Sequence, residues 1–328
     1  MRPISVHKYG GSVLRGRNSF GGVIADVARA VAAGRSVVAV VSAFEGTTDS
    51  LVSRARAVAS RPEVEALDLV LSTGEVESAA LLALALNEAD CPARVLNPFQ
   101  IGIETDGAHG AARVTRIDPA TIFTRLSSAP VVVVPGFLGR GPNGALTTLG
   151  RGGSDLSAIA LAAALGAERL DLVKDVPGYF SADPAIVPDA VHRPRLDLGD
   201  ALELARRGND LVQARALERA SRFVVRSVAD GRGLETLVDR SGLDGPAGVA
   251  SLSLRRGGEA GDDEVSAVGP DPGGEREARA ELLAAGLSIR GTERTERRLT
   301  VAVAAGEGER ALAVLHRVFV REAAGAAV

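Results

Sequence analysis

The sequence has few aromatic residues, no tryptophan and a single cysteine, Cys91. Aromatic residues make up 3% of the chain and the net charge is -3, so nothing favours base stacking or attraction to nucleic acid or a membrane surface. One cysteine cannot form an internal disulfide, which favours a reducing compartment. No apolar run approaches transmembrane length, and the N-terminus lacks a signal-peptide pattern. We therefore expect a cytoplasmic protein with a small-molecule partner, no nucleic acid and no membrane.

Histidine and lysine are also scarce. The four histidines share no spacing typical of metal ligands, and no Ser-His-Asp or Cys-His arrangement is present, so we expect no protein-held metal and no nucleophilic triad. Of the 38 basic residues, only Lys8 and Lys174 are lysines. A compact ammonium can serve where a planar guanidinium cannot, so both lysines are candidates for a functional site. Chance retention in an arginine-rich composition is an equal alternative on composition alone.

The first 240 residues alternate apolar runs with amphipathic stretches, which is typical of an α/β domain with a mainly parallel sheet. The valine run Val131–Val134 indicates a central strand covered on both faces. Strands are predicted at Ile4–Tyr9, Ser36–Ser42, Val131–Val134, Leu170–Lys174 and Phe223–Arg226. Helices are predicted at Phe20–Ala33, Thr48–Ala59, Glu75–Leu86, Ser154–Leu165, Leu198–Arg207 and Leu211–Ser221.

The pattern changes after residue 240. Gly242–Gly248 is rich in Gly and Asp and is predicted to be a linker. The order strand, helix, strand, strand, helix then follows, which is typical of a small ferredoxin-like α+β domain at residues 241–328. Its last strand is missing from that order, and Val249–Leu254, just upstream, is the candidate to supply it. The elements are predicted at Glu264–Val268, Glu275–Ala285, Leu287–Arg290, Leu299–Ala304 and Glu307–Val318.

The end of the first predicted strand carries Lys8, Tyr9, Gly10, Gly11 and Ser12. Ligands of open α/β sheets bind beyond the carboxyl ends of the strands. Paired glycines let backbone N–H groups close on phosphate oxygens, and the lysine adds a positive charge. By itself this signal is weak, because a Gly-Gly pair after a strand is more often only a turn.

A second motif, Thr147–Asp155 (TTLGRGGSD), opens a strongly helical stretch. Ser154 or Asp155 can cap that helix, which is the plainer explanation of both residues. Three glycines around Arg151 are nevertheless costly unless the backbone must approach a ligand closely. The guanidinium can bind a carboxylate with two hydrogen bonds, and the free N–H groups at the helix start favour anions. We therefore favour a functional interpretation.

Three further segments are candidates with a weaker signal. Val173–Tyr179, with Ala182-Asp183-Pro184, is a strand that ends in a charged pair and a Pro-Gly turn, and on spacing alone it is more often only a turn. Ser42–Asp49 offers hydroxyls after the second strand. Ser72–Glu75 is predicted to begin a helix, where the carboxylate would face the helix dipole or receive a substrate ammonium.

Taken in order, these segments resemble the amino acid kinase family and, within it, the aspartate kinases. The family's K-F-G-G-T-S-V is similar to KYGGSVL here, one residue shorter after the glycines, and T-T-L-G-R-G-G-S-D is matched in full. V-S-A-x-x-x-x-T-D, S-x-G-E, Q-x-G-I-x-T-D, D-V-x-G-x-x-x-A-D-P and E-x-x-E-L-A-x-x-G also have counterparts. The C-terminal part resembles a single ACT regulatory domain. The resemblance implies a three-layer α/β/α kinase domain at residues 1–240, followed by that domain.

The resemblance also implies an activity: transfer of phosphate from ATP, with Mg²⁺, to the side-chain carboxylate of L-aspartate, by a homodimer. It assigns catalysis to Lys8 and Asp155 and phosphate binding to the loop after the first strand. The substrate-binding residues that it implies are Ser42, Thr48, Glu75 and Arg151. The phosphate- and nucleotide-binding residues are Gly10, Gly11, Ser12, Lys174, Asp175, Tyr179 and Asp183.

The sequence departs from the family pattern in three places. Asp210 stands where the family usually has a lysine near the nucleotide, and Ala185 stands where it usually has an arginine. Lys174 or Arg215 could compensate for the lost charges. Aspartate kinases usually carry two ACT domains and only one is present in this pattern, so we do not expect ordinary feedback by lysine or threonine. A kinase for an aspartate analogue, or a non-catalytic kinase-fold subunit, remains the alternative.

Overall fold

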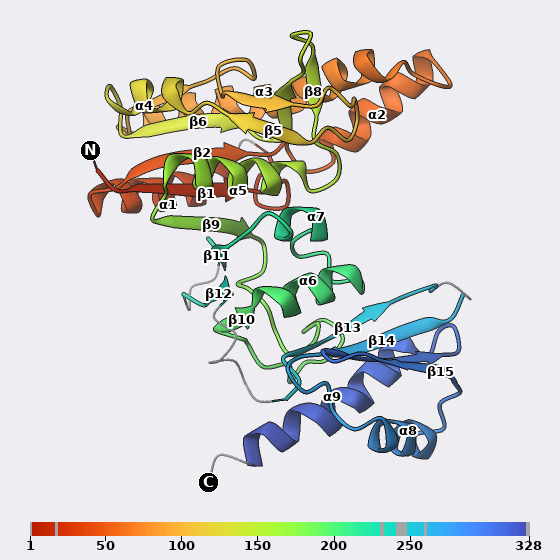
Figure 1. The fold of residues 1–328 in the computed structure, drawn as a ribbon. Helices are drawn as coiled ribbons and strands as arrows, with labels where there is room; N and C mark the ends of the chain where they lie inside the picture. Colours follow the sequence, from red (N-terminus) through yellow and green to blue (C-terminus); the bar gives the residue numbers. More distant parts are fainter. Residues whose placement is uncertain (1, 17–18, 230–232, 241–247, 259–260, 326–328) are drawn as a thin grey trace. The chain divides into compact units, whose positions relative to one another are not determined.

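The computed structural model describes residues 2–16, 19–229, 233–240, 248–258 and 261–325. The chain divides into two compact units (Figure 1). The first unit holds Met1–Pro177 and Phe223–Leu234, and the second holds Gly178–Arg222 and Glu235–Val328. We describe each unit by itself.

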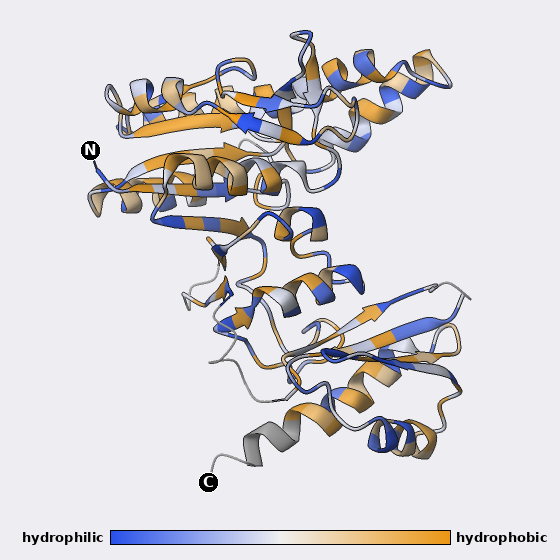
Figure 2. Cartoon of the chain, viewed as in Figure 1, coloured by the Kyte–Doolittle hydropathy of each residue, from blue (hydrophilic) through white to orange (hydrophobic). Residues whose placement is uncertain are grey.

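The sheet of the first unit is parallel, as predicted. Its strands follow the order β11-β9-β1-β2-β6-β3, and each neighbouring pair runs in the same direction. Strands β1, β2 and β6 are completely buried, which explains the continuous apolar runs of β2 and β6. Figure 2 shows β2 and β6 as mainly hydrophobic. The strand bounds are β1 Ile4–Tyr9, β2 Ser36–Val41, β3 Ala93–Val95, β6 Val131–Pro135, β9 Arg169–Lys174 and β11 Arg222–Ser227.

Helices cover both faces of this sheet, so the predicted three layers are present. Side chains of α1 (Phe20–Ala32) and α3 (Val64–Glu88) share one apolar cluster with Val37, Ala39 and Val133. Alternation along a strand turns Val38 and Val40 to the opposite face, where α5 (Gly153–Leu165) contacts β1, β2 and β9. Helices α2 (Thr47–Val58) and α4 (Ala120–Leu126) complete the unit. Among the described helices, α3 has the length and hydropathy of a membrane span, but it packs against β3, β6 and β8 (Leu146–Thr148).

A buried charge cluster fixes β1 to its neighbours. The Arg226 guanidinium, on β11, donates to Asp26 of α1 over two contacts of 2.8 Å and to Asp171 of β9 at 2.6 Å. The Tyr9 hydroxyl donates to Asp26 at 2.8 Å. Burial alone would raise the pKa of Asp26, but hydrogen bonds from His7 and Arg226 hold that pKa well below its ordinary value. The strand that carries Lys8 is therefore held to this cluster through Tyr9.

The sequence did not predict a second, small sheet in this unit, with the order β5-β4-β7-β8. Its strands are β4 Ile103–Thr105, β5 Val114–Ile117, β7 Leu138–Arg140 and β8 Leu146–Thr148. They are too short for a periodic signal, and glycines interrupt them. Strand β8 leads directly into the Gly150–Gly153 turn and α5.

One predicted helix boundary is wrong. Ser72–Glu75 lies in the middle of α3, which begins at Val64, so Glu75 does not sit at a helix N-terminus. The Ser72 and Thr73 hydroxyls bond back to the carbonyls of Leu69 and Val70 instead of capping. Gly74 looks like a break in the sequence, but its missing side chain makes room for α2: a Cβ there would lie 3.0 Å from Thr47 Cγ2.

The second unit contains the predicted ferredoxin-like sheet. Its order is β13-β14-β16-β15, all antiparallel, and the upstream strand β13 supplies the missing edge as expected. Helices α8 (Glu275–Ala284) and α9 (Gly308–Gly325) accompany it, and side chains of α8 and α9 share an apolar cluster with Leu252, Val265 and Val301. The strands are β13 Ser251–Arg255, β14 Asp263–Val268, β15 Ile289–Arg294 and β16 Arg298–Val303.

The rest of the second unit departs from prediction in one place. Helix α6 (Leu198–Arg206) is where it was expected, but the predicted helix Leu211–Ser221 is reduced to α7 (Ala214–Leu217). The short parallel strands β10 (Arg195–Asp197) and β12 (Glu235–Asp239) pair beside α6. The predicted linker falls almost wholly on residues 241–247, outside the described residues. The two units are defined by how the chain packs, and their bounds do not test a division into residues 1–240 and 241–328. The domain boundary at 240/241 therefore stays a prediction.

Candidate functional site

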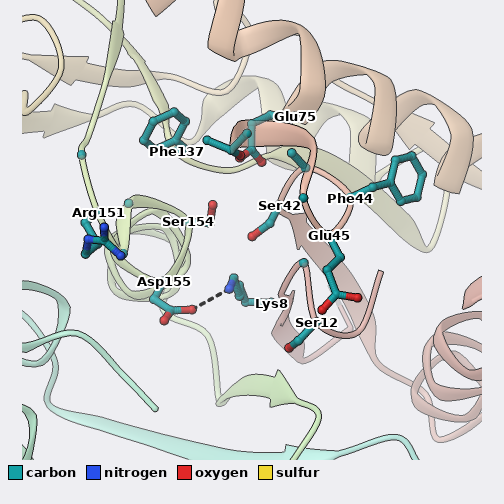
Figure 3. Close-up of a pocket in the computed structure, with 17 residues that line it drawn as sticks. Lys8, Ser12, Ser42, Phe44, Glu45, Glu75, Phe137, Arg151, Ser154 and Asp155 are labelled. Carbon is teal, nitrogen blue, oxygen red and sulfur yellow. Dashed lines mark ion pairs between the residues drawn. The ribbon is translucent and has the colours of Figure 1, made fainter. Parts of the chain in front are cut away.

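A pocket of about 410 Å³ opens at the carboxyl ends of β1 and β2 in the first unit (Figure 3). Five segments line it: the loops that follow β1, β2 and β6, the middle of α3, and the turn that enters α5. Figure 3 shows Lys8 paired with Asp155, and Ser42, Ser154 and Glu75 around the same space. The pocket is lined by Lys8, Gly11, Ser12, Ser42, Ala43, Phe44, Glu45, Gly46, Thr48, Glu75, Phe137 and the six residues from Gly150 to Asp155.

Asp155 holds both lysines of the chain. Its Oδ1 is 2.9 Å from Lys8 Nζ, and its Oδ2 accepts a hydrogen bond of 2.8 Å from Lys174 Nζ. Burial alone would raise the pKa of Asp155, but the Lys174 and Lys8 ammonium groups outweigh it and hold the pKa at about 2. Two ammonium groups on one carboxylate leave a net positive charge, which suits a phosphate.

The glycine loop after β1 has the close approaches that a phosphate cradle requires. A Cβ on Gly10 would lie 3.2 Å from Lys8 Nζ, and a Cβ on Gly11 would lie 3.2 Å from the Ala43 carbonyl oxygen. Among the described residues, the N–H groups of Gly11 and Ser12 have no hydrogen-bond partner. Free N–H groups beside an ammonium form an anion-binding site. The Ser12 hydroxyl donates to Asp175 at 3.1 Å.

The turn that carries Arg151 ends at the open N-terminus of α5. Gly150 and Gly152 have φ of 75° and 73°, a left-handed conformation that other residues adopt at a cost. Gly152 occupies the N-cap position, so no side chain closes the helix N–H groups. A Cβ on Gly153 would lie 2.7 Å from the Phe137 ring. The positive end of the helix therefore faces the pocket, with an exposed arginine beside it.

Glu75 reaches the pocket from the middle of α3 and is 5% exposed. Burial raises the pKa of Glu75 to about 8, against the opposing effects of the Ala43 N–H and the Lys8 ammonium. Its Oε2 is buried and has no hydrogen-bond partner among the described residues. An unpartnered buried carboxyl oxygen beside an open pocket is a ready acceptor for a cationic ligand.

The pocket can align two anions and one cation. The lysine pair, the glycine loop and the α5 N-terminus favour negative charge, whereas Glu75 favours an ammonium. An amino acid beside a phosphate has this distribution of charge.

The structure brings most of the predicted site residues together. Eight line the pocket: Lys8, Gly11, Ser12, Ser42, Thr48, Glu75, Arg151 and Asp155. Gly10 adjoins Lys8, Lys174 bonds Asp155, and Asp175 bonds Ser12, so these three belong to the same cluster. Tyr179 and Asp183 lie in the second unit: Tyr179 is buried, and Asp183 accepts a hydrogen bond from the Ala185 N–H within a turn. Their proposed contact with a nucleotide stays a prediction.

Sequence reasoning missed three lining side chains, Phe44, Glu45 and Phe137. Phe44 and Glu45 fall inside the Ser42–Asp49 motif but carried no signal of their own. Phe137 has φ of 68°, which is rare for a residue other than glycine. Only the folded backbone reveals that conformation, so the sequence held no pointer to it. Ser154, assigned to helix capping, makes no side-chain cap and lines the pocket instead.

Comparison with known proteins shows the family of the chain. A sequence model of the amino acid kinase family matches residues 3–228. The aspartokinase of Geobacillus stearothermophilus is 41% identical over 222 residues, and aspartokinase 2 of Bacillus subtilis is 40% identical over 224. These matches cover 68% and 67% of this chain and 54% of each relative, so the chain spans about half the length of its curated relatives.

A solved structure is similar over nearly the whole chain. The structure of Escherichia coli aspartokinase III in complex with aspartate and ADP superposes with a TM-score of 0.80 at 22% identity. The match covers 95% of this chain and 99% of that one. At this identity the likeness shows a shared fold.

Proposed function

Because the chain belongs to the amino acid kinase family, we propose that it transfers the γ-phosphoryl group of ATP to the side-chain carboxylate of L-aspartate, forming 4-phospho-L-aspartate. The observation that carries the proposal is one pocket that combines the Lys8–Asp155 pair, the open α5 N-terminus and the buried Glu75. The similarity to two aspartokinases at about 40% identity supports this substrate.

The chemistry needs alignment and charge neutralisation more than proton transfer. A carboxylate is already ionised at neutral pH, so it attacks phosphorus without a general base. Its oxygen forms a bond to the γ-phosphorus as the bond to the bridging oxygen breaks, and ADP leaves. Lys8 and the Gly11 and Ser12 N–H groups offset the charge on the transferring group.

Mg²⁺ fits this pocket as an ion carried by the nucleotide. Among the described residues no group of three or more His, Cys, Asp or Glu could hold a metal, and Asp155 is occupied by the lysines. Phosphate oxygens and water are the usual main ligands of Mg²⁺ in kinases. The ion would neutralise charge on the phosphates.

Recognition of the amino acid follows from the same pocket. Glu75 would hold the substrate ammonium, and Arg151 the carboxylate that is not phosphorylated. Ser42 and Thr48 supply hydroxyls to the same pocket. This set supports an active enzyme over a non-catalytic subunit, because Lys8, Glu75, Arg151 and Asp155 line one pocket.

Trapping with hydroxylamine tests the proposal. Purified protein, MgATP and each of a panel of amino acids are incubated with hydroxylamine, which converts an acyl phosphate to a hydroxamate. We expect hydroxamate with L-aspartate and little with asparagine or glutamate. ATP binding without hydroxamate from any member would instead support the non-catalytic subunit.

Glu75 gives a prediction with a pH signature. Burial raises its pKa to about 8, so at pH 7 it must lose its proton to receive an ammonium. We expect the KM for aspartate to fall as pH rises toward 8 in the wild type, and E75Q to raise that KM by about 10- to 100-fold and abolish the trend. Steady-state kinetics from pH 6 to 8 measure both.

The same shift affects stability with a defined sign. A folded pKa raised above the ordinary 4.5 means that burial favours the neutral acid, so stability is lost as pH rises from about 4.5 through 8. Glutamine mimics the neutral acid, so E75Q should lose less stability than the wild type over the same rise in pH. Thermal melts at pH 6 and 9 compare the wild type with E75Q. Equal losses of melting temperature in the two proteins would contradict the raised pKa of Glu75.

Lys174 is expected to compensate for the basic residues that Asp210 and Ala185 replace. Its ammonium lies on the same carboxylate as that of Lys8, and burial lowers its pKa against the attraction of Asp155. K174M should raise the KM for ATP and lower kcat by about tenfold each, with the KM for aspartate little changed. Kinetics with either substrate varied will show this. An unchanged KM for ATP would show that Lys174 does not contribute to phosphate binding.

The remaining parts of the proposal concern organisation. We propose a kinase domain at residues 1–240 and a single ACT-like domain at residues 241–328, the latter supported by the ferredoxin-like strand order. Tyr179 and Asp183 are proposed to lie against the nucleotide. A homodimer and a cytoplasmic location are also proposed, and the free, buried Cys91 suits a reducing compartment.

A further inference from the structure

A buried carboxylate outside the pocket, Asp68, joins three segments of the first unit. Asp68 lies about two helical turns before Glu75, on the same face of α3, and is 1% exposed. None of the sequence motifs included it. A buried carboxylate needs strong partners, and the identity of these partners shows what Asp68 holds in place.

Asp68 binds the end of β8 with both oxygens. Its Oδ1 accepts a hydrogen bond of 2.6 Å from the Thr148 hydroxyl, and its Oδ2 accepts one of 3.1 Å from the Thr148 N–H. Oδ2 also accepts from the Gly110 N–H at 3.2 Å and lies 2.8 Å from His109 Nδ1. Helix α3, the loop after β4 and strand β8 therefore meet on one carboxylate.

Asp68 holds Thr148 two residues before the arginine turn begins at Gly150. The following Leu149 is buried and its N–H donates to the Phe137 carbonyl at 2.8 Å. Beyond it come Gly150, Arg151 and Gly152, of which both glycines are in the left-handed region. Glycines restrain a backbone weakly, so the position of Arg151 depends on how firmly the end of β8 is held.

We propose that Asp68 is a positioning residue that sets Arg151 relative to Glu75. Helix α3 then carries Glu75 directly and holds the arginine turn through Asp68, so one rigid element fixes the spacing between the ammonium-binding and carboxylate-binding groups. This inference rests on the proposed function and assigns a role to a residue that need not touch the substrate. Small displacements of binding groups are costly to catalysis, which gives the role a measurable size.

The test is a kinetic cycle of D68N, R151A and the double variant. The amide cannot accept hydrogen bonds with both of its polar atoms, so the end of β8 loosens. We expect D68N to raise the KM for aspartate by about tenfold with kcat and the KM for ATP within about threefold. In the R151A background, D68N should raise that KM no further. Effects that multiply across the two sites would overturn the proposal.

Two further variants separate positioning from general stability. Asn87, also on α3, makes three hydrogen bonds to Ala83 and Ala93, remote from β8. N87A should lower the melting temperature and leave the KM for aspartate unchanged. If D68N does not fold, T148V answers the question, because it removes only the hydroxyl donor and should raise the KM about threefold. An unchanged KM in T148V would then count against the proposal.

Calorimetric titration of the protein with aspartate distinguishes a failure of the proposed reaction from a failure of the proposed role of Asp68. If the wild type binds aspartate without forming hydroxamate, the proposed reaction fails, and the dissociation constants of the same variants judge Asp68. If the wild type forms hydroxamate and D68N has the wild-type KM, only the role of Asp68 fails. No binding and no turnover with aspartate would overturn both.

Discussion

Replacing Lys8 by methionine should lower kcat by about 10³-fold. Lys8 lies near the end of β1, and its Nζ is 2.9 Å from Asp155 Oδ1. Beside it are the N–H groups of Gly11 and Ser12, which have no hydrogen-bond partner among the described residues. Removing a preorganised donor from the position where charge develops costs about 10²–10³ in rate, and here a full positive charge is lost as well. Single-turnover quench-flow with saturating MgATP and aspartate measures the chemical step.

The matched control is the other lysine, because K174M removes an ammonium from the same carboxylate. Asp155 keeps one partner in either variant, so a general effect of breaking an ion pair would be similar in both. We expect K8M to be impaired much more than K174M. Equal losses in the two variants would contradict the assignment of the transferring phosphate to Lys8.

Replacing Asp155 by asparagine should damage both activity and stability. Its carboxylate separates two ammonium groups that are mostly buried, with side-chain exposures of 7% for Lys8 and 12% for Lys174. Without it they repel each other and lose their fixed positions. Removing one partner of a buried ion pair costs about 3–5 kcal/mol, and the loss of alignment should lower kcat by about 10²–10³. Denaturant unfolding and steady-state kinetics measure the two effects.

The stability effect has a pH dependence with a defined sign. The folded pKa of Asp155, about 2, lies below the ordinary 3.8. The charged form therefore stabilises the fold above about pH 4, and that contribution is lost as pH falls from about 4 to 2. The advantage of the wild type over D155N should shrink across this window. An advantage that stays constant from pH 6 to pH 3 would show that Asp155 is not held by the lysines.

The sequence predicted the frame of the site well because strands and glycine turns have local signals. The burial of β2 and β6 makes each a continuous apolar run, and the functional residues of an open sheet follow its strands. The ferredoxin-like sheet was predicted down to its upstream edge strand, because apolar alternation marks β13, β14 and β16.

The contacts within the site could not be predicted, because they join residues distant in sequence. Asp155 looks like a helix-capping residue, and only the fold places Lys8 and Lys174 on its two oxygens. Glu75 was placed at a helix start because Ser72, Thr73 and Gly74 look like a break. The structure runs the helix through them, because the gap that Gly74 leaves is filled by α2.

Asp68 shows the same limit more sharply. In the sequence it is one acid among apolar residues of a long helix, and nothing local separates it from a solvated charge. Its partner Thr148 lies 80 positions along the chain. Residues that position a catalytic group act through tertiary contacts, so a single sequence carries no sign of them.

Isotope transfer tests the central claim, that a carboxylate of the substrate accepts the phosphoryl group. L-Aspartate labelled with ¹⁸O in its side-chain carboxylate is incubated with the protein, MgATP and hydroxylamine. Hydroxylamine attacks the acyl carbon, so the released phosphate keeps the bridging oxygen. Mass spectrometry should find one ¹⁸O in each phosphate released with hydroxamate. Phosphate without ¹⁸O would contradict transfer to the carboxylate.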